Sequence, residues 1–516
     1  MDGRIGEVRN TCGGILQRRA RLVRYSRRFN VVRKWATAIG SIDQLTPSAN
    51  GALEHDESKT NQCAKSRLIQ YTCSIWWARA GHCGTDAGRV VLTLKANAWF
   101  YNQQFVHVKV YSWNEVREHS GNDKWLVIDG QVYNITDWVR KHPGGSRVIS
   151  HYAGQDATDA FRAFHNDLKA VQKYLKPIHL GSVKPEEQQV QAIDRDFREL
   201  RKTAEKMDLF RPSYAFFFIH LAHIIAFEVL GYLVMKQFGT GWIPYLITLL
   251  CCTIVQAQTG WLQHDFGHLS VFKKSKWDHF FHYLTVGFLK GASPHWWNHM
   301  HYQHHAKPNV IDKDPDVRIA KSKKKSMPYN WQHHYFFIVG PPLLFPVYFQ
   351  YMLLRHIFTR KLWLDLVVVA MFFARLFILY FPMLGWGVIP FYFTVRCLES
   401  HWFTWVAQSN HVPMDVKADE AEPWLKLQMH ATCNVERSLF NDWFTGHLNF
   451  QIEHHLFPTM PRHNLYKIAP LVKSLCEKHG VSYQVKSLYG AFADIVKTLR
   501  HSGELWYSTY KAFHSS

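Results

Sequence analysis

Two groups of histidines in this sequence have the spacing of metal ligands on helices. His264 and His268 are four residues apart, and His301, His304 and His305 follow with spacings of three and four residues. An α-helix brings residues three or four positions apart onto one face, so each group would direct its imidazoles toward a common point. Because neutral imidazole is a common ligand of transition metals, each group predicts a metal-binding function.

Three further histidines extend this pattern. His454 and His455 end the segment Gln451-Ile-Glu-His-His, and His411 follows an apolar stretch. A lone histidine near a membrane is more often an interfacial anchor or a core residue, but several clusters close to the ends of apolar segments favour metal binding. Seven or eight imidazoles exceed what one zinc ion takes, so they suit two metal ions, and nitrogen-rich ligation suits iron.

Polar residues beside these clusters are candidates for orienting the ligand rings from outside the metal sphere. These candidates are Asp265, Asp314, Asp316, Asn410, Gln451 and Glu453. Four other histidines are weaker candidates for direct ligation, and they are His295, His299, His333 and His334.

A second constellation, nearer the N-terminus, has the features of a haem pocket. His142 begins the turn His-Pro-Gly-Gly, in which small residues let the backbone approach a macrocycle. His165 ends an amphipathic stretch whose Phe161 and Phe164 could pack a flat apolar slot. A haem with two histidine ligands needs one imidazole on each face of the iron, and this pair could supply them.

Residues 125–135 predict two short strands joined by a turn at Asp129-Gly130. With the segments Val132-Tyr-Asn-Ile and Ala163-Phe-His, the region resembles cytochrome b5 over about residues 108–183. The resemblance implies that His142 and His165 are the axial ligands of haem b. When both axial positions are filled, iron has no site for oxygen, so such a domain is expected to carry electrons.

The metal clusters need a scaffold, and the apolar stretches between Phe216 and Val406 predict one in a membrane. These stretches are residues 216–235, 242–261, 335–354, 362–381 and 385–406. If all clusters meet on one membrane side, the chain crosses an even number of times between the second and third clusters. The stretch 335–354 contains Pro341, Pro342 and Pro346 and is followed by basic residues, so we expect it to lie at the interface, leaving four spans.

The rest of the sequence contains no motif that suggests a further catalytic or binding site. Residues 1–104 carry a basic run and are expected to be a disordered extension, and residues 184–212 are a charged linker. The net charge of +21 is explained more simply by basic flanks of membrane spans than by nucleic-acid binding. Nine cysteines without a regular framework argue against a disulfide-stabilised secreted protein.

The histidine pattern resembles the membrane fatty acid desaturases. The resemblance runs from about Trp113 to the C-terminus and includes His264-Asp-Phe-Gly-His, His305-Ala-Lys-Pro-Asn and Phe457-Pro-Thr-Met-Pro-Arg-His-Asn. A third histidine box that begins with Gln451, together with an N-terminal cytochrome b5, is similar to the front-end acyl-CoA desaturases of animals. One departure is the short segment from Arg318 to Ser326, where that family usually has a longer one.

This resemblance implies a fold class and an activity. The expected fold is multi-domain: an α+β cytochrome b5 domain (residues 105–183), then an all-α transmembrane desaturase domain (213–516) with a cytosolic histidine-rich cap. The expected enzyme uses O2, two iron ions and electrons from haem b to desaturate an acyl-CoA. NADH-cytochrome b5 reductase would be its partner, and the endoplasmic reticulum membrane its location, with the haem domain and histidines facing the cytosol.

Alternatives remain open from the sequence. Some motifs resemble those of delta-5 enzymes and others those of delta-6 enzymes, and we favour delta-6 regioselectivity. A sphingolipid desaturase or a hydroxylase would use the same scaffold, because both begin by hydrogen abstraction. From another class, a non-catalytic membrane haem electron carrier would need the haem histidines but not the three clusters.

Overall fold

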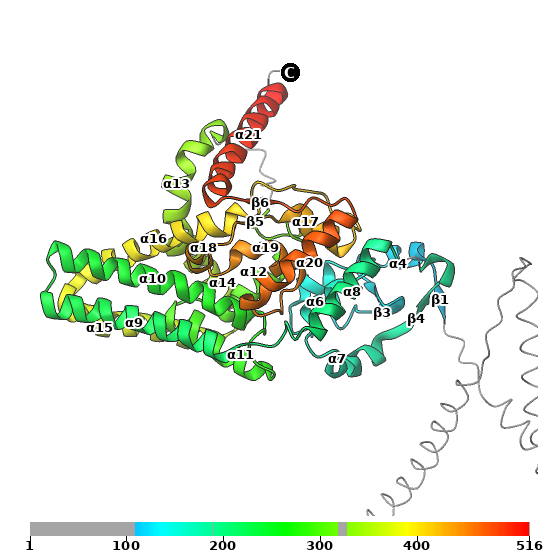
Figure 1. The fold of residues 1–516 in the computed structure, drawn as a ribbon, viewed down its shortest axis with the longest axis horizontal. Helices are drawn as coiled ribbons and strands as arrows, with labels where there is room; N and C mark the ends of the chain where they lie inside the picture. The colour runs from blue at the N-terminus through cyan, green and yellow to red at the C-terminus, as the bar shows by residue number, and fades with distance from the viewer. Residues whose placement is uncertain (1–108, 189, 318–327, 515–516) are drawn as a thin grey trace, which may run out of the picture. The chain divides into compact units, whose positions relative to one another are not determined.

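The structure is a computed structural model, and it describes residues 109–188, 190–317 and 328–514 (Figure 1). The basic extension of residues 1–104 lies outside the described residues. The short segment from Arg318 to Ser326 lies outside them as well, so what the sequence suggests about both regions stays a prediction.

Residues 109–188 form a small domain in which short helices accompany one sheet. Its strands lie in the order β1 (Val110–Tyr111), β4 (His179–Val183), β3 (Gln131–Asn134) and β2 (Trp125–Ile128). Between β2 and β3, Asp129 and Gly130 have φ angles of 51° and 71°, as a two-residue hairpin turn requires. The predicted strand, turn and strand are therefore confirmed. The helices are α4 (Trp113–Glu118), α5 (Ser146–Ser150), α6 (Thr158–Phe164) and α7 (Leu168–Leu175).

The charged linker contains a 15-residue helix, α8 (Ala192–Lys206). Its apolar residues recur every three or four positions, and Ile193, Phe197, Leu200 and Ala204 are buried on one face. These side chains join a core that continues into both neighbouring domains. The linker is therefore solvated on one face only, because its other face packs against the rest of the protein.

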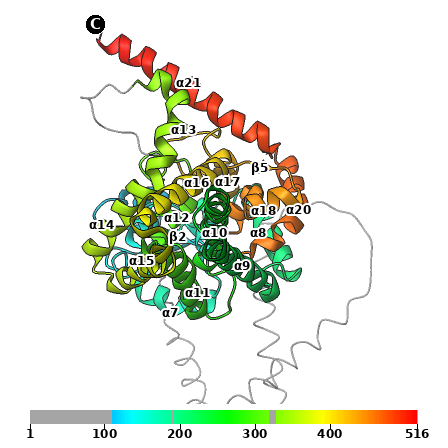
Figure 2. The ribbon, with the colours of Figure 1, turned by 90° about the vertical axis from the view of Figure 1, so that its left-hand side faces the viewer.

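Four long helices run together in the helical domain (Figures 1 and 2). They are α9 (Tyr214–Phe238), α10 (Trp242–Gly267), α15 (Trp363–Leu384) and α16 (Val388–Ser409). Their outward faces are apolar, since Ile219, Ile243 and Ile378 are 66%, 74% and 73% exposed. A helix that faces water carries polar residues on that side, so this surface is that of a membrane protein.

Four segments are long and apolar enough to cross a membrane, judged by length and composition among the described residues. They are Tyr214–Phe238, Trp242–Gly267, Gln332–Arg360 and Trp363–Ser409. The last one is a hairpin of α15 and α16, because the rings of Phe373 and Tyr392 lie 5.5 Å apart across a turn at Gly385, whose φ is 53°.

The segment Gln332–Arg360 is the one that the sequence places at the membrane interface. It consists of α13 (Gln332–Leu343), a π-helical turn (Leu344–Phe349) and α14 (Gln350–Arg360). Since the segment is also long and apolar enough to span, its interfacial position stays a prediction.

The remaining elements form a cap at one end of the bundle. It comprises α11 (Ser275–His282), a π-helical turn (Tyr283–Leu289), α12 (Pro294–Ala306), α17 (Trp424–Ala431), α18 (Leu439–Phe444), α19 (Gln451–Leu456) and α20 (Leu465–Lys478). Strands β5 (Asn434–Val435) and β6 (Val485–Lys486) pair in parallel, and α21 (Leu488–His514) follows β6.

Candidate metal and haem sites

The cap and the adjoining ends of α10 and α16 bring together all eight candidate histidines. These are the first box (His264, His268), the second box (His301, His304, His305), the third box (His454, His455) and a fourth position, His411. Ser293 caps α12 by accepting a hydrogen bond from the backbone of Trp296, and this fixes the start of the helix that carries the second box. The positions are the last turn of α10 and the residue after it (His264, His268), α12 (His301, His304, His305), the turn after α16 (His411), and α19 (His454, His455).

Five of these histidines form a first group, defined as His264, His268, His301, His305 and His454. Their ligand nitrogens all lie within 4.8 Å of one another. The Nε2 atom of His301 is 2.9 Å from that of His268 and 3.0 Å from that of His305. Two ligands at right angles on a metal with bonds of about 2.1 Å would lie about 3 Å apart, so this spacing fits a metal.

The other three histidines form a second group, defined as His304, His411 and His455, whose ligand nitrogens also lie within 4.8 Å of one another. The buried Nε2 atom of His455 has no hydrogen-bonding partner among the described residues. Gln451, the first residue of the third box, places its Nε2 atom 2.9 Å from Nε2 of His411. A buried nitrogen without a partner is costly, so the second group also fits a metal ion.

Polar groups outside the two clusters hold several rings by their Nδ1 atoms. Nδ1 of His304 lies 2.9 Å from the Asp314 carboxylate, and Nδ1 of His455 lies 3.0 Å from Oε1 of Gln428. Nδ1 of His411 donates to the Ala431 carbonyl oxygen at 2.9 Å. Each contact leaves the Nε2 atom of the ring for a metal and sets the orientation of the ring.

Burial controls the protonation of the clusters. Burial, followed by the mutual repulsion of the histidines, holds the pKa values of His301, His305, His454 and His455 well below the usual range, so these imidazoles are neutral. Burial also lowers the pKa of His304, but the Asp314 carboxylate outweighs it and raises that pKa to about 9. A metal at His304 must therefore displace a proton.

Other residues named from the sequence lie elsewhere. His295 hydrogen-bonds to Asp365, and, within the described part of the chain, neither His299, His333 nor His334 joins a group of three metal-binding side chains. Three of the candidate orienting residues bind partners other than the clustered imidazoles. Asp265 pairs with Arg462, Asn410 donates to the Cys433 carbonyl, and Glu453 accepts from Asn434 and Tyr483.

His142 and His165 lie close together in the sheet domain, with their ring planes at 67°. Their ring centroids are 6.2 Å apart, and two imidazoles on opposite faces of an iron with bonds of about 2 Å would have centroids about 6 Å apart. Nδ1 of His165 donates to the Phe161 carbonyl at 2.8 Å, and Nδ1 of His142 to that of Gly145 at 3.3 Å. Burial lowers the pKa of both, that of His142 to about 4, so both rings are neutral.

The turn after His142 depends on its glycines. A Cβ atom on Gly144 would lie 2.9 Å from Cε1 of His142, and Gly145 has a φ of 102°. Any side chain at Gly144 would therefore displace the His142 ring. The two neutral rings and the close backbone fit a haem.

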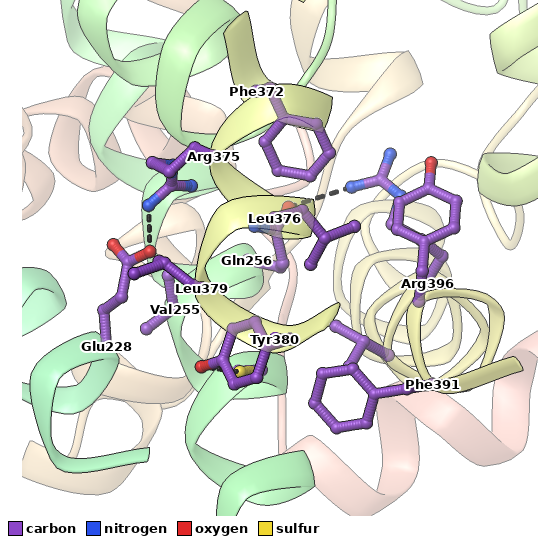
Figure 3. A pocket seen from close by; sticks show the side chains of 13 residues that line it. Glu228, Val255, Gln256, Phe372, Arg375, Leu376, Leu379, Tyr380, Phe391 and Arg396 are labelled. Atoms are coloured by element: carbon purple, nitrogen blue, oxygen red, sulfur yellow. Dashed lines mark hydrogen bonds and ion pairs between the residues drawn. The ribbon is translucent and has the colours of Figure 1, made fainter. Parts of the chain in front are cut away.

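A cavity lies inside the four-helix bundle, lined by side chains of α9, α10, α15 and α16 (Figure 3). Most of its wall is apolar, but Arg375 pairs with Glu228, and Arg396 donates to Gln256 at 3.0 Å. Gln256 precedes His264 by eight residues on α10, about 12 Å along the axis. The cavity is thus on the bundle side of the metal clusters.

Two supporting groups escaped the sequence analysis. Gln428 and the Ala431 carbonyl lie on α17, which has no metal-ligand spacing, and they reach the histidines only through the folded cap. Gln428 also donates from Nε2 to the His305 carbonyl at 3.1 Å, so it links the second and third boxes. No local pattern could have identified them, because glutamine and a backbone carbonyl are unremarkable in sequence.

Two family models match parts of this chain. Residues 240–487 match the model of the fatty acid desaturase family, and residues 112–184 match that of the cytochrome b5-like haem/steroid binding domain. The chain fuses a cytochrome b5-like domain to a fatty acid desaturase domain. The fatty acid desaturase family is an oxidoreductase family, and the cytochrome b5-like domain fits the role of electron transfer.

A solved structure, "Cytochrome b5 of Ostreococcus tauri virus 2", is 39% identical over 14% of this chain and 94% of that one, with a TM-score of 0.14. Because this TM-score is too low to support an argument about the fold, the domain assignment depends on the two family models. They confirm the expected fold class, a cytochrome b5 domain with a small sheet followed by a helical desaturase domain with four candidate membrane helices. They also support haem binding by the first domain and a membrane setting for the second.

Proposed function

We propose that this chain is a front-end acyl-CoA desaturase that inserts a cis double bond into polyunsaturated acyl chains. The observation that carries the proposal is the pair of histidine groups, five and three side chains, in a domain that matches the fatty acid desaturases. A haem-type histidine pair in the same chain supplies the second requirement, a source of single electrons.

The proposed roles follow the geometry of each site. His142 and His165 would hold haem b as axial ligands. The first and second histidine groups would each hold one iron ion. The bound iron pair would supply the O2-dependent oxidising power that an unactivated C–H bond needs and that acid–base side chains lack.

The protein's own residues would orient and protect this chemistry. Asp314 and Gln428 fix the rings of His304 and His455, so their Nε2 atoms converge before metal binds. Gln451 places its amide 2.9 Å from Nε2 of His411, so it would lie beside a metal ion held by the second group. The apolar bundle cavity would receive part of the acyl chain, and the charged head would stay outside the bilayer.

We also propose the domain limits and setting that the sequence suggests. The haem domain spans residues 105–183, a linker spans 184–212, and the desaturase domain spans 213–516. NADH-cytochrome b5 reductase would reduce the haem from the cytosol, and the protein would be a multi-pass protein of the endoplasmic reticulum. Both the haem domain and the histidine cap would face the cytosol, because only that side gives a soluble reductase domain access to the haem.

Expression in a yeast host tests the activity and its regioselectivity. Cells would be fed linoleic, alpha-linolenic or dihomo-gamma-linolenic acid, and the fatty acids would be read by gas chromatography. Conversion of the first two supports the delta-6 activity that we favour, and conversion of the third alone would make the enzyme a delta-5 desaturase. No new double bond in any of the three would contradict the proposal.

The variant His304→Ala separates an enzyme from a haem electron carrier. Because His304 belongs to the second metal group, its loss should abolish product formation while the haem absorbance stays intact. Wild-type protein should hold about three irons per chain, one in haem and two in the clusters, whereas a carrier would hold about one. Normal desaturation by the variant would refute the metal assignment.

A further inference from the structure

We propose that Phe164 is the electron bridge between the haem and the metal clusters, so that electrons leave the haem on the side of His165 and enter at His305. This inference rests on the proposed function, because it needs a haem and an iron pair that exchange electrons. It goes beyond that function by assigning the route to one side chain.

The segment that carries the second haem histidine is bound to the desaturase domain on both sides. The Ala163 carbonyl accepts a hydrogen bond from Oγ1 of Thr459 at 3.3 Å, and Asn166 donates to the Leu269 carbonyl at 2.8 Å. Leu269 directly follows His268 of the first box, and Thr459 lies four residues after His455 of the third. The His165 segment is therefore held against two of the three boxes.

Phe164 fills the space between these anchors. Its ring centroid lies 6.5 Å from that of His305, 6.1 Å from that of Tyr302 and 6.2 Å from that of Trp424, each in an edge-on arrangement. Phe164 is bonded to His165, so one aromatic side chain links the haem histidine pair with the first metal group. A continuous path of bonded and packed atoms favours electron tunnelling over a path that crosses open space.

A second set of contacts holds the two domains at this separation. Tyr152 donates its hydroxyl to the Ala306 carbonyl at 2.7 Å, next to His305 at the end of α12. Lys307 is 2% exposed, donates to Gln155 at 2.7 Å and pairs with Asp419 at 3.0 Å. Because a buried lysine is tolerated only with such partners, Lys307 and Tyr152 join the two domains at the end of the helix that carries the second box.

Each transfer moves one electron and no atoms. His142 and His165 would hold the haem that gives up one electron, and the first group would hold the iron that takes it up, so the transfer balances. A flavoprotein reductase that uses NADH would then return the haem to the ferrous form. Phe164 itself is neither oxidised nor reduced in a lasting way, so its ring serves as a medium.

The test compares Phe164→Leu and Phe164→Tyr with the wild-type holoenzyme. With oxygen excluded, one equivalent of reductant is added rapidly, and oxidation of the ferrous haem by the ferric clusters is followed by stopped-flow absorbance. We expect Phe164→Leu to slow this oxidation severalfold and Phe164→Tyr to restore most of the rate, because a tyrosine ring fills the same gap. Tyr174→Leu, which removes a half-exposed ring of the haem domain, should match the wild type.

Two readouts that do not depend on turnover distinguish a bridge from a docking residue. The reduction potential of the haem should be unchanged in Phe164→Leu. In a second sample, Mn2+ replaces the cluster iron. A nearby Mn2+ ion speeds the spin relaxation of the ferric haem, and the size of this effect reports the distance between the two sites. The effect should also be unchanged in Phe164→Leu. Loss of this enhancement would mean that Phe164 only docks the domain, and wild-type oxidation rates in Phe164→Leu would refute the bridge outright.

Failure of the proposed function gives a different result. In that case the wild-type haem would not be oxidised by the clusters at all, and no product would appear in the feeding experiment. If the wild-type protein transfers electrons and makes product but Phe164→Leu does both at the same rate, only the route through Phe164 is wrong.

Discussion

Three polar groups contact the Nδ1 side of the rings in the second histidine group, so Nε2 of each ring would be the atom that faces a metal. The Asp314 carboxylate at His304, the Gln428 amide at His455 and the Ala431 carbonyl at His411 all contact Nδ1. Since a neutral imidazole has one donor and one acceptor nitrogen, a proton held at Nδ1 leaves a lone pair at Nε2 in His411 and His455. His304 would reach the same state when a metal displaces its second proton. The second histidine group is therefore oriented before any metal arrives.

Asp314→Asn tests this orientation at the scale of one residue. The substitution removes the charge that raises the pKa of His304 to about 9 and weakens the hold on its ring. Loss of such an outer partner typically costs about 10–100-fold in metal affinity. Iron retained against a chelator should fall accordingly, with the haem absorbance unchanged.

Asp316→Asn is the matched control. Its carboxylate lies 3.8 Å from the same Nδ1 atom and is 52% exposed, so its charge is screened by solvent and should matter less. Equal iron loss in the two variants would show that the general negative charge, and not the Asp314 contact, supports the site.

At the scale of elements, two short helices each supply histidines to both groups. Helix α12 carries three histidines of the second box, yet it divides them, because His301 and His305 turn toward the first group and His304 toward the second. A similar division separates the neighbours His454 and His455 on α19. One short helix can thus contribute to two metal positions.

The turn after His142 gives a test at the scale of an element. In Gly144→Ala the new methyl group would meet Cε1 of His142 at 2.9 Å, so the ring must move and haem affinity should fall severalfold. Gly121→Ala is the control, since nothing lies within 4 Å of a Cβ atom there. A titration of the apoprotein with haem measures both, and unchanged affinity in Gly144→Ala would contradict the tight-turn account.

Membrane topology is tested at the segment Gln332–Arg360. If this segment lies at the interface, Lys361 is on the same membrane side as the histidine cap, and Trp386, in the turn of the α15–α16 hairpin, is on the opposite side. In intact microsomes, an impermeant thiol reagent should label Lys361→Cys but not Trp386→Cys. The native cysteines of the described residues are buried or half-buried, and the parent protein measures their background labelling. Labelling of Lys361→Cys only after permeabilisation would make the segment a true span.

At the scale of the whole molecule, haem and metal domains share one continuous core. Buried residues of the sheet domain, of α8 and of α20 belong to the same hydrophobic cluster. The polar contacts of Lys307 and Tyr152 lie beside that core, at the end of the helix that carries the second box. Separation of the domains would expose apolar surface and break the hydrogen bonds of Lys307 to Gln155 and of Tyr152 to Ala306.

Lys307→Met should loosen this interface. The change removes the hydrogen bond that Lys307 donates to Gln155 of the haem domain, and it leaves Asp419 with Lys313 as its remaining partner. We expect faster hydrogen exchange in α5 and α6 without loss of haem, because neither haem histidine contacts Lys307. The control Lys313→Met removes the other partner of Asp419, which is 29% exposed, and should have a smaller effect. Equal exchange in Lys307→Met and wild type would argue against docking through Lys307.

The sequence by itself determined the features that depend on near neighbours. The hairpin at Asp129-Gly130 follows from residues that tolerate positive φ, and the apolar helices follow from runs long enough for a membrane. The pairing of His264 with His268 follows from the helical period, and their rings do lie 4.7 Å apart. Each of these depends on a few consecutive residues, so local chemistry is sufficient.

Only the tertiary structure decided how the histidines divide into groups of five and three, and which residues support them. Gln428 reaches His455 across 27 positions of sequence, and Tyr152 reaches Ala306 across 154. Such contacts depend on how separate helices pack, and no spacing along the chain encodes them. The docking of the haem domain, with Phe164 against His305, is settled in the same way, by burial of apolar surface between distant segments.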